Sequence, residues 1–216
     1  MRIGIIGGTG EIGEGMAMRL SRIMDVCVGS RDVAKAQETC DVCLFSAKEN
    51  KFECSVKGGS NQNVVDESDL IILAVPFKHV RSTVEGLTGW EDKIVISPVN
   101  PMERKESFVY TPPAEGSAAL YLKSILPAST RICTAFNNIA GNKWRDIHSD
   151  LTYSVPVCGD DAQAKQIVMD LVDRISLLKA YDAGPLSGSH IVESITPLLL
   201  NVARYNRMKD VGIRFV

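Results

Sequence analysis

A glycine-rich segment near the start of the chain carries the clearest chemical signal. It reads Gly7-Gly8-Thr9-Gly10-Glu11-Ile12-Gly13 and lies between an apolar run, residues 2–6, and a stretch with helical spacing of apolar residues. In such a turn Gly8 permits a tight bend, Gly10 leaves room for phosphates beside the backbone, and Gly13 lets the helix approach the strand. Because the first amides of a helix lack internal partners, the segment predicts a diphosphate site. An ordinary strand-turn-helix connection is the alternative.

A second group of polar residues follows at the end of the next apolar run, residues 25–29. Ser30 and Arg31 stand where a site for NAD carries an acidic residue that binds the ribose 2′-hydroxyl. Arg31 can fork onto phosphate oxygens, Ser30 can donate a hydrogen bond, and Lys35 adds a charge one helical turn later. These residues predict a preference for NADP(H), with solvated surface charge as the alternative. Asp32 would oppose a 2′-phosphate, and we therefore expect its carboxylate to cap the following helix.

The rest of the chain supplies the elements that must position these residues. Apolar runs at residues 70–75, 93–97 and 130–136 are typical of buried parallel strands, and helical patterns cover residues 33 to about 47 and 118–126. A short strand is expected within residues 51–59, and Pro76 is expected to begin a helix. The alternation predicts an α/β fold with a doubly wound, Rossmann-like parallel sheet.

The C-terminal part predicts a second, smaller region. It contains strand-like residues 155–161, a helix over 164–175, a strand ending at 182 and a long last helix. We expect these elements to form a small C-terminal α/β region, residues 155–216, that covers the cleft of an N-terminal domain, residues 1–154. The last helix carries apolar residues at helical spacing: Ile191, Ile195, Leu198, Leu199 and Val202. We expect this face to lie in the core or between subunits, and a wall against a flat cofactor is the alternative.

Loops after the predicted strands are the remaining candidates for binding residues, since ligands of such sheets lie beyond the carboxyl ends of the strands. His79 can contact a nicotinamide ribose or form a hydrogen bond within its own loop. Asn137 and Asn138 can bind a carboxamide or close a turn.

The composition excludes several classes of partner. The formal net charge is −2 without a basic stripe, so nucleic acid is not an expected partner. No apolar run reaches the roughly 18 residues that span a bilayer, so we expect no membrane contact and a cytoplasmic location. Cys40, Cys43 and Cys54 have part of the spacing of a zinc site but lack a fourth ligand, and we predict no metal. A local redox role or no role remains open for these thiols.

With these motifs in hand, the chain resembles the NADPH:coenzyme F420 (deazaflavin) oxidoreductase family over nearly its full length. The resemblance rests on the glycine loop, on Gly29-Ser30-Arg31 with Lys35, on Val75-Pro76 with His79, on Ser97-Pro98, on Asn138-Ile139, and on two long segments, residues 155–161 and 182–198. The two C-terminal segments are far more specific than the glycine loop.

This resemblance implies roles for individual residues. Thr9, Gly10, Glu11 and Ile12 would bind the diphosphate, and Ser30, Arg31 and Lys35 the 2′-phosphate. The nicotinamide half would be lined by Val75, His79, Asn100 and Gly141, with Ile139 near the facing rings. The family has a second basic residue where Asp32 stands, so the 2′-phosphate would be held less tightly here. Residues 40–60 also depart from the family pattern.

The activity implied by the resemblance is direct hydride transfer between NADP(H) and coenzyme F420 in a homodimer. Such transfer needs no catalytic residue beyond those that position the rings, in keeping with the lack of an evident acid-base pair. The alternatives are an NADPH-dependent flavin or ferric reductase of related fold and a non-catalytic NADP-sensing module. A dehydrogenase of small carbonyl substrates would need a proton donor that the chain does not offer.

Overall fold

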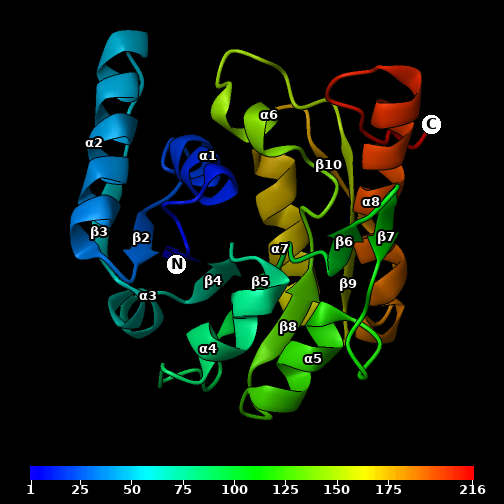
Figure 1. Ribbon diagram of the computed structural model, residues 1–216. Coiled ribbons are helices and arrows are strands. Elements are labelled where there is room, and N and C mark those ends of the chain that lie inside the picture. The colour runs from blue at the N-terminus through cyan, green and yellow to red at the C-terminus, as the bar shows by residue number, and fades with distance from the viewer.

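The computed structural model of the protein describes residues 1–216 (Figure 1). One eight-stranded sheet organises it. Its strands are β1 (Ile3–Ile6), β2 (Val26–Ser30), β3 (Val56–Ser60), β4 (Leu70–Leu73), β5 (Ile94–Ser97), β8 (Arg131–Thr134), β9 (Ser154–Gly159) and β10 (Lys179–Asp182). They lie in the order β10-β9-β8-β5-β4-β1-β2-β3. Because the chain leaves β1 towards β2 on one side and later returns to β4 on the other, the order reverses beside β1. This is the switch point at which such sheets bind ligands.

Within the large sheet the six strands β3, β2, β1, β4, β5 and β8 are all parallel, as predicted, whereas β9 runs antiparallel to β8. β10 then pairs in parallel with β9. The segment 155–216, predicted as a smaller region, thus adds its two strands to the same sheet.

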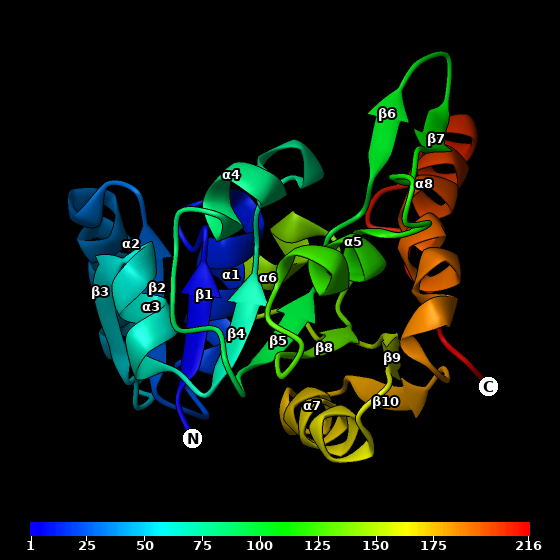
Figure 2. The same ribbon diagram turned by 90° about the horizontal axis from the view of Figure 1, so that it is seen from below.

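Helices cover both faces of the sheet (Figure 2). One face carries α1 (Glu11–Leu20), α2 (Val33–Asn50) and α7 (Ala162–Arg174), and the other carries α3 (Asn61–Glu67), α4 (Val80–Val84) and α5 (Ala118–Ile125). The last helix, α8 (Ser189–Asn206), lies beyond β9 beside a small hairpin of β6 (Met102–Arg104) and β7 (Phe108–Tyr110). Both faces of the central strands are therefore buried, which explains their continuous apolar sequence.

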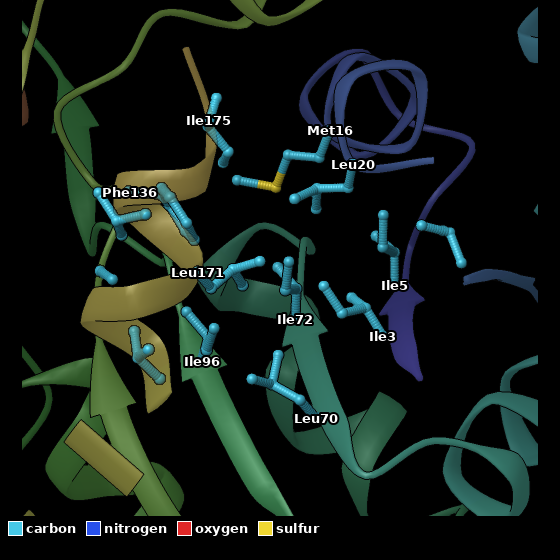
Figure 3. Packing of buried hydrophobic residues seen from close by; sticks show 14 of the residues in the cluster. Ile3, Ile5, Met16, Leu20, Leu70, Ile72, Ile96, Phe136, Leu171 and Ile175 are labelled. Atoms are coloured by element: carbon cyan, nitrogen blue, oxygen red, sulfur yellow. The ribbon is translucent and has the colours of Figure 1, made fainter. Parts of the chain in front are cut away.

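The larger of the two apolar cores fixes the glycine-loop helix to the sheet. Ile5 of β1 and Ile72 of β4 meet Met16 and Leu20 of α1, and Leu171 of α7 closes the same space (Figure 3). All five side chains are at most 2% exposed. Burial of one such side chain contributes roughly 1.5–3 kcal/mol, so this packing holds the loop between β1 and α1 in place.

Several short elements were not predicted. They are α3, the β6–β7 hairpin and α6 (Gly141–Arg145). Each of these helices and strands is at most seven residues long, and the residues of β6 are all exposed, so hydrophobic periodicity gives little signal. The predicted helix from residue 33 is confirmed and extends to Asn50, and the expected short strand is β3. After Pro76 the chain forms a 3₁₀ turn, η1 (Phe77–His79), before α4 begins.

The apolar face predicted on α8 is only partly buried. Leu199 lies in the interior, but Ile191 and Leu198 are more than half exposed. The buried stripe instead includes Val192 and the carboxylate of Glu193. None of the helices has the length and apolar character required to cross a bilayer.

Candidate functional site

The turn between β1 and α1 depends on three glycines. Gly7, rather than Gly8 as predicted, adopts the left-handed backbone conformation, with φ of +74°. A Cβ on Gly8 would lie 2.7 Å from Val28 of β2, so Gly8 is needed for close approach to the neighbouring strand. A Cβ on Gly13 would lie 2.5 Å from the carbonyl oxygen of Gly7, which confirms that Gly13 lets the helix sit against the loop.

The N-terminus of α1 opens outward from this turn. Gly10 is the N-cap residue and provides no side-chain hydrogen bond to the helix amides. The first hydrogen bond of the helix runs from the Glu14 amide to the Gly10 carbonyl at 2.8 Å, so the amides of Glu11, Ile12 and Gly13 precede the internal ladder. Free amides and the positive end of the helix dipole together favour an anion such as a diphosphate.

Cationic side chains follow β2 at the same edge of the sheet. Arg31 and Lys35 are exposed, and neither takes part in a salt bridge. Ser30 is largely buried, and its hydroxyl accepts a hydrogen bond from the Asp32 amide at 3.1 Å. Asp32 Oδ1 accepts from the Ala34 amide at 3.1 Å, so the predicted capping of α2 is confirmed. Two unpaired cations are thus available to an anionic ligand.

A cavity of about 540 Å³ joins these features at the switch point of the sheet. Its lining includes seven of the predicted binding residues: Thr9, Gly10, Ser30, Arg31, Lys35, Val75 and His79. The lining also includes Gly7, Asp32 and Pro76, which belong to the motifs found in the sequence, and three residues to which the sequence assigned no role: Asn61, Ala74 and Thr83. Asn61 begins α3, whose start could have been found from Ser60 and Asn63, which form a capping box.

The other predicted binding residues lie outside the lining of this cavity. Gly8 and Gly13 form the base of the turn, whereas Glu11 and Ile12 are exposed in the first turn of α1. Gly141 packs against these two residues, because a Cβ there would lie 3.1 Å from Glu11 and 3.3 Å from Ile12. The structure therefore brings the loop after β8 to the N-terminus of α1.

Asn100 and Ile139 lie in the loops after β5 and β8. Asn100 donates to the Asn137 carbonyl at 3.1 Å and accepts from the Asn137 side chain at 3.0 Å, so it joins the two loops. Asn138 donates to the Ser154 carbonyl at 2.8 Å. Ile139 is 5% exposed. Asn137 and Asn138 are buried, and their side-chain amides connect the end of β8 to the loop after β5 and to β9.

The backbone is strained where these loops leave β8. Phe136 has φ of +66°, a conformation that an aromatic residue rarely adopts. The next residue, Asn137, receives a hydrogen bond at its carbonyl from the Thr196 hydroxyl of α8. Contacts from another element thus help to hold the strained turn at the site edge.

Arg19 fixes the segment that carries Gly141. Its guanidinium is buried and donates to the carbonyls of Trp144 at 3.0 Å and Lys143 at 2.9 Å, near the end of α6. Burial lowers the pKa of Arg19 from its ordinary value, because the charged form loses water contacts. Arg145, the last residue of α6, pairs with Glu14 of α1 at 2.9 Å. These contacts hold α6 across α1.

A buried carboxylate joins α8 to the rest of the molecule. Glu193 is fully buried and accepts hydrogen bonds from the Tyr110 hydroxyl at 2.9 Å and from the amides of Ala118 and Ala119 at 2.9 and 3.1 Å. Burial raises the pKa of Glu193, although these hydrogen bonds oppose the shift. The carboxylate caps the positive end of α5 and connects it to the hairpin.

None of the six cysteines lines the cavity, and five of them are buried. Burial raises the pKa of Cys43 to about 12 and that of Cys40 to about 11, so both are neutral thiols near neutral pH. No group of three or more potential ligand side chains in the chain could hold a metal ion.

The fold and the cavity define the class of protein. A glycine loop before a helix N-terminus, at the switch point of a mostly parallel sheet, is the arrangement of Rossmann-like nucleotide-binding proteins. The family model described as "NADP oxidoreductase coenzyme F420-dependent" matches residues 2–101. The chain belongs to this family of F420-dependent NADP reductases.

Comparisons with individual proteins extend the match over the full length. The chain is 33% identical over 219 aligned residues to the F420-dependent NADP reductase of Methanocaldococcus jannaschii, covering 99% of this chain and 97% of that one. It is 31% identical to the F420-dependent NADP reductase of Methanothermobacter thermautotrophicus, covering 99% of this chain and 94% of that one. A crystal structure from Arthrobacter sp. FB24, described as a candidate F420-dependent NADP reductase, shares the fold with a TM-score of 0.82 at 18% identity, covering 100% and 99% of the two chains.

Proposed function

We propose that this protein transfers a hydride directly between NADP(H) and coenzyme F420. The observation that carries the proposal is the cavity in which unpaired Arg31 and Lys35 stand beside the open N-terminus of α1. These groups match the two anionic parts of NADP, its 2′-phosphate and its diphosphate. Coenzyme F420 as the second substrate is supported by the F420-dependent NADP reductases that align with 99% of this chain.

The residues of the cavity suit a nucleotide in physical terms. Gly10 leaves backbone amides open where a side chain would block them, and a hypothetical Cβ there would meet only one neighbouring atom, at 3.6 Å. Arg31 and Lys35 supply charge for the 2′-phosphate, and Val75 and His79 continue the lining from the end of β4. We propose that Asn100, Ile139 and Gly141 shape the part of the site that receives the nicotinamide.

Hydride transfer requires that two rings lie about 3–3.5 Å apart with water excluded, and the nicotinamide supplies or accepts the hydride. The protein then contributes binding and orientation rather than proton transfer. Among the cavity residues only Arg31, Asp32, Lys35 and His79 have ionisable side chains, and no hydrogen bond joins the His79 ring to another side chain. This lining lacks the paired acid and base that reduction of a carbonyl would require.

The decisive experiment mixes the purified protein with NADPH and oxidised coenzyme F420 and follows the visible absorbance of the deazaflavin. We expect the absorbance to fall as the deazaflavin is reduced, and to recover when excess NADP is added. Parallel reactions contain a flavin or a ferric chelate in place of coenzyme F420. Turnover with these acceptors alone would identify a flavin or ferric reductase, and NADPH binding without any turnover would identify a sensing module.

A further inference from the structure

A negative charge shares the cavity with the two cations. Asp32 lines the same space as Arg31 and Lys35, yet its carboxylate forms no salt bridge with either of them. One oxygen, Oδ1, accepts from the Ala34 amide at 3.1 Å, and Oδ2 has no hydrogen-bond partner in the protein. The cap therefore holds the carboxylate in place without neutralising it.

The position of this carboxylate is fixed by the start of α2. The Asp32 amide donates to Ser30 Oγ at 3.1 Å, so the residue is tied at both its backbone and its side chain. Asp32 lines the cavity beside Ser30 and Arg31. A ligand group bound by these two residues is consequently close to the carboxylate.

The two forms of the cofactor respond differently to such a charge. A 2′-phosphate carries close to two negative charges and is repelled, whereas a 2′-hydroxyl is neutral and can donate a hydrogen bond to a carboxylate oxygen. Acidic residues at the end of the second strand serve this purpose in NAD sites. Arg31, Lys35 and Asp32 together bring a formal charge of only +1 to the cavity.

We propose that Asp32 is a specificity-determining residue that weakens binding of the 2′-phosphate and allows the site to accept NAD(H) as well as NADP(H). This inference rests on the proposed nucleotide site, but it does not depend on coenzyme F420. It assigns to Asp32 a second role beside the capping of α2.

The substitution Asp32→Asn separates these roles, because asparagine caps helices about as well as aspartate and carries no charge. Binding of NADPH and NADH to the full-length protein is measured by titration of nucleotide fluorescence. For two negative charges about 6 Å from an exposed carboxylate, screened by salt, we expect the affinity for NADPH to rise roughly threefold to tenfold. The affinity for NADH should not rise, because its 2′-hydroxyl loses a charged hydrogen-bond acceptor. The gain for NADPH should shrink in high salt.

Asp41→Asn is the matched control, since Asp41 is an exposed carboxylate on the same helix outside the cavity lining. It should leave both affinities unchanged. Asp32→Ser, which also retains a capping oxygen, replaces the first variant if Asp32→Asn does not fold. Three outcomes would overturn this inference alone. In Asp32→Asn they are an unchanged or lower affinity for NADPH, or an equal gain for both nucleotides. In the wild type the outcome is binding of NADPH without binding of NADH. A wild-type protein that binds neither nucleotide would overturn the proposed function as well.

Discussion

The substitution Arg31→Ala tests the nucleotide assignment most directly. Arg31 is exposed, unpaired and part of the cavity lining, so its charge is available to a ligand. A phosphate with close to two negative charges about 4 Å from the guanidinium gains about 2 kcal/mol in water-like surroundings. Loss of this attraction corresponds to a roughly thirtyfold weaker affinity for NADPH at low salt. NADH lacks the phosphate, and we expect its affinity to change by less than about threefold.

The assay measures the dissociation constants of both nucleotides by fluorescence titration, which avoids the dependence of KM on later steps. Lys48→Ala is the control, because Lys48 lies in the last turn of α2, the helix that follows Arg31, and is not part of the cavity lining. It should leave both dissociation constants unchanged. If Arg31→Ala weakened NADPH and NADH equally, or weakened neither, the assignment of Arg31 to a 2′-phosphate would be wrong.

Three further substitutions test how the site is supported. Gly13→Ala places a Cβ 2.5 Å from the Gly7 carbonyl oxygen, so the helix must shift; we expect a lower Tm and at least about tenfold weaker NADPH binding. Burial raises the pKa of Glu193, so this group favours the folded state at low pH and its contribution is lost as pH rises through the raised pKa. We therefore expect the Tm of the wild type to fall between about pH 4 and about pH 7 more than the Tm of Glu193→Gln does. An identical dependence of Tm on pH in both proteins would contradict the assignment. Asn201 donates to the Phe108 carbonyl at 2.7 Å and accepts from the Phe108 amide at 2.8 Å. We expect Asn201→Ala to lower the free energy of unfolding by about 1–3 kcal/mol and to speed hydrogen exchange of the Phe108 amide. Unchanged exchange would show that the hairpin does not depend on these two hydrogen bonds.

The parallel core of the fold and one half of the site were predictable because their signals are local. Continuous apolar runs such as β4 can be buried only between two helical layers, and a glycine loop that joins a strand to a helix has few other solutions. The same applies to Asp32, whose capping role follows from its position before α2. The tight bend was predicted at Gly8, whereas Gly7 has the positive φ. The sequence cannot distinguish two adjacent glycines, since their roles differ only in what each packs against.

By itself, then, the sequence determined the order of the longer helices and of the strands of the main sheet, the cationic end of β2 and the expectation of a bound phosphate. All of these depend on residues close together in the chain. Only the tertiary structure decided that β9 runs antiparallel to β8 and that Asn61 and Thr83 join the cavity. It also decided that Glu193 is buried rather than solvated, because its three donors come from residues 74 to 83 positions away. Such contacts bring together segments that are distant in sequence, and no local pattern records which buried donors a carboxylate will meet.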